Sequence, residues 1–210
     1  CVMPNFNSDN DEKYVWIQSA GHQMERSTGE VYSVSMSLLD VFSYKAVEGD
    51  LKQMERPNTV IISRSEAKRL GVGVGDLIFV PHIGDNFLDY YRSRGRKDDA
   101  PEKQLEVVAI FEDFAPNCEV AKYKMLRNIG TFAHSGNEDD YGLNMFIYYL
   151  KLHDGASIEN IKSIYHQALV ERNKYSEWPA EDERLAKETE ILDLLPIADI
   201  YYTEDITQGD

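Results

Sequence analysis

The segment at residues 57–76, PNTVIISRSEAKRLGVGVGD, constrains the fold more strongly than any other part of the chain. An apolar strand is expected at Thr59–Ser63, and it leads directly into a helix. Ser63 and Glu66 have the S-x-x-E spacing of a capping box, in which each residue satisfies a backbone donor at the helix start. A second apolar strand is expected at Leu77–Val80. The segment therefore predicts a strand–helix–strand unit with a sharply defined helix start.

Three glycines, Gly71, Gly73 and Gly75, follow this helix rather than precede it. In a phosphate-binding loop the glycines lie between a strand and the start of a helix, where free N–H groups and the helix dipole attract an anion. The C-terminal end of a helix carries partial negative charge instead. Gly71 suits the left-handed residue that closes the last turn of a helix. We therefore expect a turn into the next strand here and not a phosphate site.

The balance of charges argues against whole classes of function. The chain has 210 residues, of which 28% are charged and 42% hydrophobic, and its formal net charge is −15. A nucleic-acid-binding protein needs a basic surface to neutralise phosphates, and attachment to an anionic membrane surface needs one too. We therefore expect a globular protein with a substantial core and no nucleic-acid partner.

The ends and the cysteines leave several alternatives open. The longest apolar runs have about eight residues, whereas a membrane helix requires about 20. No signal peptide is recognisable, and because the chain begins at Cys1 rather than at a Met, we expect it to be a processed or excised piece of a longer protein. Cys1 and Cys118 are the only cysteines, too few for a disulfide framework. A bridge between them and a lipid-modified Cys1 both remain open.

No pattern in the sequence predicts a catalytic, cofactor or metal site. None of the five histidines belongs to a zinc-binding motif, and no two lie four residues apart. The G-x-S-x-G turn of serine hydrolases does not occur, and the segment SDNDEK lacks the glycine of a calcium loop. We therefore expect no catalytic residue, no cofactor and no metal, and we do not expect this chain to be an enzyme.

One segment departs from the general acidity and is a candidate partner contact. Arginine side chains beside aromatic rings suit contact surfaces, because the planar guanidinium forms paired hydrogen bonds and stacks on rings. The alternative is a solvated hairpin tip whose charges offset the neighbouring aspartates. We call these residues the basic segment: Tyr90, Tyr91, Arg92, Arg94, Arg96 and Lys97.

The remaining pattern predicts an α+β protein with mixed sheets and few helices. Residues 1–12 are polar and aperiodic, which indicates a tether. Ser37 is expected to cap a short helix, and Ser157 a longer one whose apolar residues recur at spacings of three and four. Further strands are expected at Tyr14–Gln18, 30–36, 104–114, 144–152 and 189–196.

Five segments, taken in order, form a recognisable series. They are YSVSMSLLDVFSYKAVEGD, PNTVIISRSEAKRLGVGVGD, LEVVAIFEDFAPNCEV, YYLKLHDGASIENIKSIY and LLPIADIYYTED. Together they cover roughly residues 30–205, and they resemble the MacB-like periplasmic core domain, which is the extracytoplasmic domain of FtsX-type ABC transporter permeases. Three departures from the family pattern are Ala109 in place of a common Gly, Cys118 in place of Ser, and a longer hairpin at residues 82–104.

The resemblance implies one domain of two lobes, the smaller inserted in the larger. Lobe one would take about residues 12–50 and 119–205, and lobe two about residues 51–118. The domain would lie outside the cytoplasm, on the periplasmic side, as part of an inner-membrane permease. A second permease copy and a cytoplasmic ABC ATPase would be its partners, with another extracytoplasmic protein as a further candidate.

The implied role is mechanotransmission, in which ATP-driven movement of membrane helices is coupled to export, lipoprotein release or signalling outside the membrane. Such a domain carries no catalytic site of its own. Two alternatives from other classes stay open. One is a free-standing extracytoplasmic binding lipoprotein anchored at Cys1, and the other is a secreted enzyme.

Overall fold

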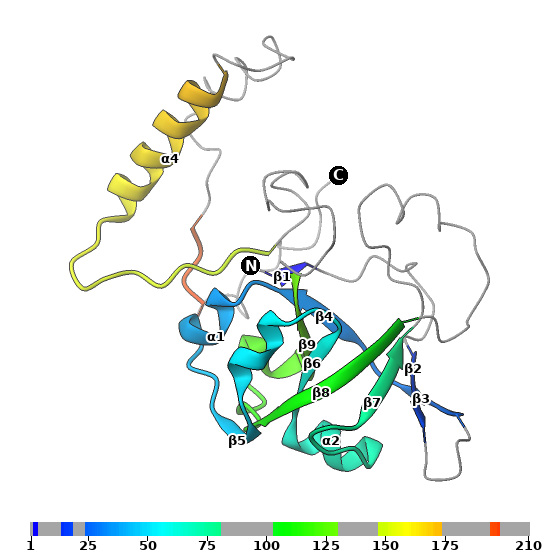
Figure 1. Cartoon of the computed structure of the whole chain (residues 1–210). Helices are drawn as coiled ribbons and strands as arrows, with labels where there is room; N and C mark the ends of the chain where they lie inside the picture. Colours follow the sequence, from blue (N-terminus) through cyan, green and yellow to red (C-terminus); the bar gives the residue numbers. More distant parts are fainter. Residues whose placement is uncertain are drawn as a thin grey trace. The chain divides into compact units, whose positions relative to one another are not determined.

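The computed structural model describes residues 2–3, 14–18, 24–80, 103–129, 147–173 and 194–197 (Figure 1). The chain divides into two compact units, Cys1–Leu150 and Lys151–Asp210. In the described part of the first unit, nine strands form one mixed sheet with short helices around it. The predicted α+β class is confirmed.

The strands of the first unit follow the order β1-β4-β9-β6-β8-β7-β2-β3, and β5 pairs with β8 beside this path. The pairs β4–β9 and β6–β8 are parallel, and the other pairs are antiparallel. In chain order the strands are β1 (Val2–Met3), β2 (Tyr14–Gln18), β3 (Met24–Thr28), β4 (Val31–Val34), β5 (Ala46–Gly49), β6 (Thr59–Ser63), β7 (Leu77–Val80), β8 (Lys103–Phe111) and β9 (Met125–Asn128).

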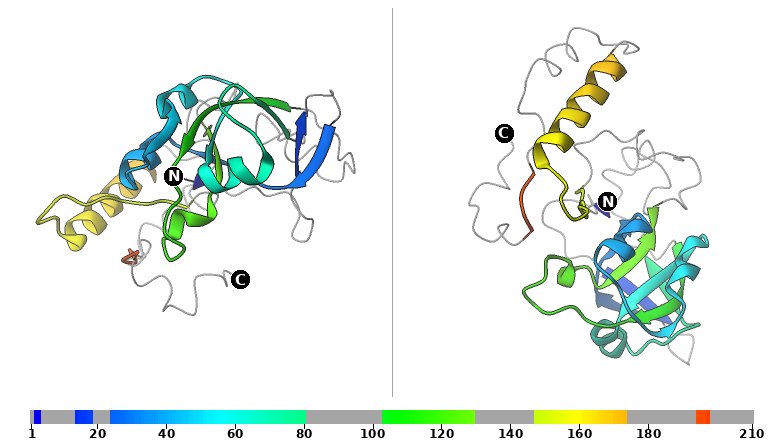
Figure 2. Two further views of the ribbon diagram at one scale, coloured as in Figure 1. Left: turned by 90° about the horizontal axis from the view of Figure 1, so that it is seen from below. Right: turned by 90° about the vertical axis from the view of Figure 1, so that its left-hand side faces the viewer.

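The sheet curls into a nearly closed barrel. Strands β3 and β4 lie far apart in the strand order, yet only Gly29 and Glu30 separate them along the chain. Three Cα steps reach at most about 11 Å, little more than two strand spacings of about 4.8 Å each. A Cβ on Gly29 would lie 2.9 Å from Met125 of β9 and 3.2 Å from Val15 of β2. Strand β3 at one end of the sheet therefore lies close to β4 near the other end, at Gly29. Figures 1 and 2 show the curved sheet from three directions.

Two hydrophobic cores lie on the two sides of this curved sheet. Along β6, Val60 and Ile62 point into the barrel, whereas Ile61 points outward, and all three are fully buried. The inner core also contains Val15, Val31, Ala67, Leu70, Val72, Ile78, Val80, Leu105, Val107, Ile110 and Met125. The outer core consists of Val34, Leu38, Leu39, Tyr44, Met54, Ile61, Val108, Ala109, Phe111, Val120, Tyr123 and Leu126.

Three short helices contribute to the outer core. They are α1 (Ser37–Val41), η1 (Leu51–Glu55) and η2 (Glu119–Lys122), of which the last two are 3-10 helices. Each supplies at least one buried side chain, such as Leu38, Met54 and Val120. Burial on both faces explains why β6 is a continuous apolar run without polar alternation.

At a bulge in β8, the backbones of β5 and β8 approach each other unusually closely. Val60 and Ile61 of β6 pair with Val107 and Ala109 of β8, so Val108 is the extra residue of the bulge. Val108 and Ala109 consequently both face the outer core. Gly49 of β5 lies against this bulge with φ +75°, and a Cβ there would lie 2.2 Å from the Val108 carbonyl oxygen. Only glycine fits this position without displacing backbone atoms.

The strand–helix–strand prediction for residues 57–80 is confirmed. Helix α2 (Arg64–Leu70) starts after Ser63, whose hydroxyl accepts the Glu66 amide at 3.4 Å. Gly71 is left-handed at φ +69°, as predicted, and its N–H is bonded to the carbonyl of Ala67. Only half of the capping box forms, since the Glu66 carboxylate accepts from Arg69 instead.

The glycine-rich segment after α2 is a turn, as predicted. Asp76 accepts the Gly73 amide at 2.7 Å through its side chain, and the Asp76 amide donates to the Gly73 carbonyl at 3.2 Å. The Gly75 amide donates to the Val107 carbonyl at 2.8 Å. These backbone donors are used inside the fold, in the connection to β7.

Several other predictions were wrong. Residues 1–12 were expected to be a tether, but Val2 and Met3 form β1. This strand pairs with β4 and satisfies backbone groups along the edge of β4. Ser37 does not cap α1, because Met36 holds the N-cap position and makes no side-chain cap bond. Residues 147–152 contain one isolated bridge at Ile147 rather than the expected strand.

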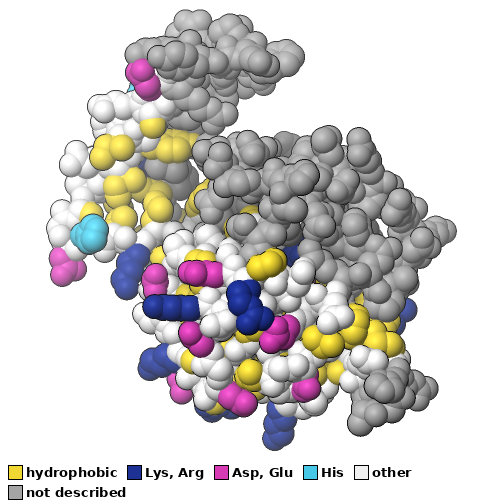
Figure 3. Space-filling view, viewed as in Figure 1, with side chains coloured by type: hydrophobic (Ala, Val, Ile, Leu, Met, Phe, Trp, Pro, Cys, Tyr) yellow, Lys and Arg dark blue, Asp and Glu magenta, His cyan; other side chains and the backbone are white. Residues whose placement is uncertain are grey.

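The second unit contains helix α4 (Ile158–Asn173). Ser157 caps it as predicted, since its hydroxyl accepts the Asn160 amide at 3.3 Å. Hydrophobic side chains lie along α4 in Figure 3, and Ile164 is 65% exposed. Among the described residues, no helix has the length and apolar character that crossing a bilayer requires.

The two-lobe division stays a prediction. In the sheet of the first unit, β4 and β9 come from the expected lobe one, and β6 and β8 come from the expected lobe two. Much of the expected lobe one, including residues 130–146 and 174–193, lies outside the described residues.

Candidate functional site

The basic segment lies outside the described residues, since residues 81–102 are not described. Its role as a partner contact therefore stays a prediction. Cys1 lies outside them too, and Cys118 is a half-buried free thiol. In the described ranges, no three or more His, Cys, Asp or Glu side chains come together in a way that could hold a metal ion.

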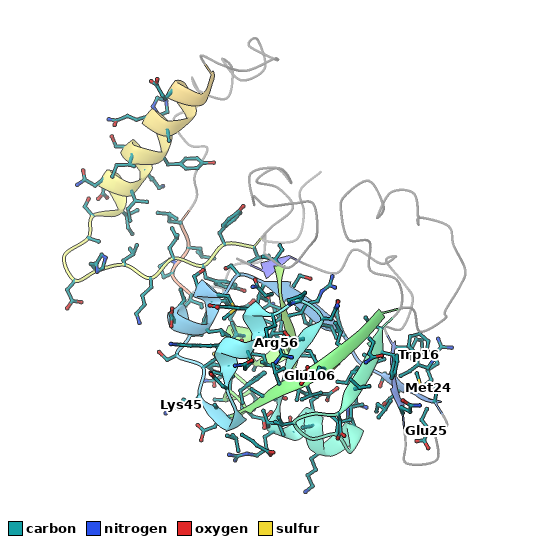
Figure 4. The ribbon with its side chains drawn as sticks, in the orientation of Figure 1. Trp16, Met24, Glu25, Lys45, Arg56 and Glu106 are labelled. Atoms are coloured by element: carbon teal, nitrogen blue, oxygen red, sulfur yellow. The ribbon has the colours of Figure 1, made fainter. Side chains whose placement is uncertain are left out.

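Charged side chains of both signs are interspersed on the described face of the barrel in Figure 3. Arg56 and Glu106, which lie side by side in Figure 4, form one such pair, with side chains that are 51% and 42% exposed. Exposed pairs of this kind contribute little to stability. The more informative polar contacts are those that are largely buried.

A largely buried polar cluster surrounds Tyr149, near the end of the first compact unit. The Tyr149 hydroxyl donates to Glu119 Oε1 at 3.1 Å and lies 3.2 Å from the Tyr123 hydroxyl. Since the Tyr149 proton goes to Glu119, the Tyr123 hydroxyl donates to the Tyr149 oxygen. The ring of Tyr149 meets Phe42 edge-on, with centroids 5.0 Å apart. We call Phe42, Glu119, Tyr123 and Tyr149 the tyrosine clasp.

Local structure positions each partner of Tyr149. Phe42 is the C-cap residue of α1, and Glu119 lies in the first turn of η2. Lys122, three residues after Glu119, forms an ion pair with it and fixes the carboxylate, whose side chain is only 10% exposed. Tyr123 is buried and packs its ring edge-on against Tyr32, with centroids 4.8 Å apart.

The Tyr149 hydroxyl stays protonated in the clasp. Burial raises the pKa of Tyr149 far above its ordinary value, and the negative charge of Glu119, which accepts the Tyr149 proton, raises it further. Burial likewise raises the pKa of Tyr44 and of Tyr32. Tyr149 therefore remains a hydrogen-bond donor to Glu119 across the whole physiological pH range.

The clasp holds one residue of an otherwise exposed segment. Residues 147–150, which we call the strap, include Ile147, Tyr148 and Leu150, whose exposed fractions are 41%, 43% and 57%. Tyr149 is the member of the strap that packs against the outer core. The second compact unit begins immediately afterwards, at Lys151. The clasp therefore fastens the chain to the barrel directly before the second unit.

The N-terminal end of α2 is tied to the barrel. Asp113 accepts the Ser65 amide at 2.9 Å, the Ser65 hydroxyl at 2.5 Å and Lys124 Nζ at 3.2 Å. Burial alone would raise the pKa of Asp113, but the bonds from Ser65 and the charge of Lys124 outweigh it and lower that pKa. The carboxylate thus joins α2 to the residues before β9.

The C-terminal end of α2 is tied to a different strand. Arg69 donates to the Thr28 carbonyl and, at 3.0 Å, to the Ser27 hydroxyl, both in β3. The pKa of Arg69 is raised by its hydrogen bond to Glu66, against the effect of burial. Polar side chains therefore tie both ends of α2 to the strands of the barrel.

Sequence reasoning missed the clasp. Tyr149 lies in an aromatic run that predicted a strand, and nothing in the run distinguishes it from Tyr148. The i, i+3 pair Glu119 and Lys122 was a usable signal for a short helical turn. The contact between Tyr149 and Glu119 joins residues 30 positions apart and could not be inferred from spacing.

Comparisons with known proteins support the fold. No protein-family model and no curated protein matches the chain. Its structure is similar to the crystal structure of a domain from Porphyromonas gingivalis that is provisionally described as part of a permease. The TM-score is 0.53 at 18% sequence identity, over 80% of this chain and 62% of that one. The present chain thus spans less than two thirds of that domain, with which it shares the fold.

Proposed function

We propose that this chain is an extracytoplasmic domain of an ABC transporter permease, of the MacB and FtsX type. Its role would be to couple ATP-driven movement of membrane helices to export, lipoprotein release or signalling. The observation that carries the proposal is the fold shared with a domain provisionally described as part of a permease. The five segments that resemble the MacB-like periplasmic core domain support it independently.

The architecture suits a mechanical role. A coupling element must move as a body, and the curved sheet buries apolar side chains on both of its faces. It must also be held firmly where movement enters or leaves. The tyrosine clasp fastens the chain where the first compact unit ends, so it is the best candidate for such a point among the described residues.

A test of location uses the full-length protein. The proposal requires apolar stretches of about 20 residues on both sides of this chain in the complete gene. Val47 is 44% exposed, so Val47→Cys, with Cys1 and Cys118 changed to Ser, provides a labelling site. A maleimide that cannot cross the inner membrane should label it in intact cells. Labelling only after the inner membrane is opened would overturn the proposal.

The basic segment is the proposed contact with a second permease copy or another extracytoplasmic protein. The segment is positively charged, whereas the net charge of the whole chain is −15. An acidic patch on the partner would therefore attract the segment. Charges at the rim of an interface alter association rate and salt dependence more than affinity. Changing Arg92, Arg94 and Arg96 to Glu should impair the activity of the folded full-length permease. Unchanged activity would show that the segment is only a solvated tip.

A further inference from the structure

We propose that residues 151–156 are a hinge on which the second compact unit turns relative to the barrel. This hinge segment follows the boundary between the two units, which falls between Leu150 and Lys151. All six of its residues are exposed, and they form no helix or strand. Figure 1 shows the segment as an irregular stretch directly before α4. Exposed backbone with few buried apolar contacts is the least stable part of a fold, and hinges consist of such loop residues.

The hydrogen bonding of the hinge segment is internal. Among the described residues, its one hydrogen bond runs from the Ala156 amide to the His153 carbonyl at 3.0 Å. This bond closes a turn in which Gly155 is left-handed at φ +77°. A Cβ on Gly155 would meet no atom within 4 Å, so side-chain packing does not hold the turn in place. A change of backbone angles here therefore breaks at most one hydrogen bond and displaces no buried side chain.

Anchored structure flanks the hinge segment on both sides. Before it, Ile147 forms a β-bridge, and the Tyr149 hydroxyl donates to Glu119 in the clasp. After it, the Ser157 hydroxyl accepts the Asn160 amide and caps α4. A hinge is a short segment that absorbs large changes in φ and ψ while the structure on either side keeps its shape. Movement is thereby confined to the residues between the clasp and the cap.

The use of the hinge rests on the proposed permease function, whereas the hinge itself does not. A domain that passes on movement needs parts that keep their own structure and a short segment that changes between them. The barrel is one such part, because apolar cores lie on both faces of its sheet. Movement of the membrane helices would then alter the angle between the two units and leave the structure of the barrel unchanged.

Nitrogen-15 NMR relaxation of the complete 210-residue chain tests the hinge without reference to its use. Amide order parameters should be about 0.85 in β6 and in the first half of α4, but below about 0.6 in residues 151–156. The amides of α4 should also report a shorter rotational correlation time than those of β6, because the smaller unit tumbles partly independently. One common correlation time for β6 and α4 would overturn the hinge.

Two matched variants locate the freedom in the segment itself. Leu152→Pro with Asp154→Pro should stiffen it, because proline fixes φ and restricts the residue before it. Asp154 precedes the left-handed Gly155 in the turn, a position that favours proline. Among the described residues, neither the Leu152 amide nor the Asp154 amide donates a hydrogen bond, so the substitutions remove none.

In the proline variant, the order parameters of residues 151–156 should rise and the difference between the two correlation times should shrink. Leu152→Ala with Asp154→Ala is the control and should leave both quantities unchanged. Unchanged amide chemical shifts in β6 show that the barrel is folded in each variant. Equal relaxation in the proline and alanine variants would refute a hinge at these residues. In the full-length permease, equal activity of the two variants would contradict the use of the hinge in coupling, a result separate from the relaxation test of the hinge itself.

Discussion

Gly49 provides a sharp test of how closely β5 approaches the bulge in β8. A Cβ on Gly49 would lie 2.2 Å from the Val108 carbonyl oxygen and 2.9 Å from the Ala109 Cα. The left-handed conformation alone costs an L-residue about 1–2 kcal/mol. Both clashing atoms belong to the backbone, and overpacking that forces backbone shifts costs about 1–3 kcal/mol more. Gly49→Ala should therefore lower the free energy of unfolding by about 2–5 kcal/mol.

Gly71→Ala is the matched control for this prediction. Gly71 has a similar φ of +69°, but a Cβ there meets no atom within 4 Å. Gly71→Ala should therefore lower the free energy of unfolding by only about 1–2 kcal/mol, the cost of the left-handed conformation alone. Urea unfolding followed by circular dichroism gives both values, provided that the denaturant slope is unchanged. Equal destabilisation by the two substitutions would refute the close approach of β5 to the bulge.

Three further predictions concern the outer core and two ionisable groups. Met54 is fully buried, so Met54→Ala should destabilise the chain by about 2–5 kcal/mol in urea unfolding, and a negligible loss would contradict its place in the core. Because the folded-state pKa of Asp113 is lowered, its stabilisation is present above pH 3.8 and is lost as the pH falls. The difference in stability between wild type and Asp113→Asn should therefore shrink in acid, and a constant difference would refute the assignment. Because the folded-state pKa of Tyr149 is raised, its contribution is present below pH 10.0 and is lost as the pH rises above that value. The wild type should then lose stability in alkali more steeply than Tyr149→Phe, and equal slopes would contradict the buried phenol.

The parts of the fold that could be predicted are those governed by local chemistry. Helix α2 carries its own cap and its own left-handed glycine, and the apolar runs of β6 and β7 flank it directly. The cap of α4 is also formed by residues that are close in sequence, since the Ser157 hydroxyl accepts the Asn160 amide. Such signals act within a few residues, so sequence spacing alone contains them.

The parts that escaped prediction depend on distant partners. Strand β3, MERST, lacks an apolar alternation and forms by antiparallel pairing with β2. Strand β9 contains the buried Arg127, whose Nε donates to Ser33 of the parallel neighbour β4 at 2.9 Å. A charged residue in a short run does not predict a buried strand, because its hydrogen-bond partner Ser33 lies 94 positions away.

The candidate site shows the same limit. The sequence indicated the basic segment because clustered charge is visible in a linear reading. The residues of the clasp come from the ends of α1 and η2 and from the strap. In the sequence, Tyr149 of the strap cannot be distinguished from the adjacent Tyr148. Only the fold shows which tyrosine of the aromatic run packs against the outer core.

Hydrogen exchange in the full-length permease, assembled with its ATPase, tests the central claim most directly. Amide exchange in residues 147–152 and 119–123 would be compared between the nucleotide-free complex and one trapped with ATP. If movement of the membrane helices reaches this domain, exchange in both segments should differ between the two states, while that of the buried strand β6 should not. The same exchange in both states, with the ATPase shown to be active, would contradict the account.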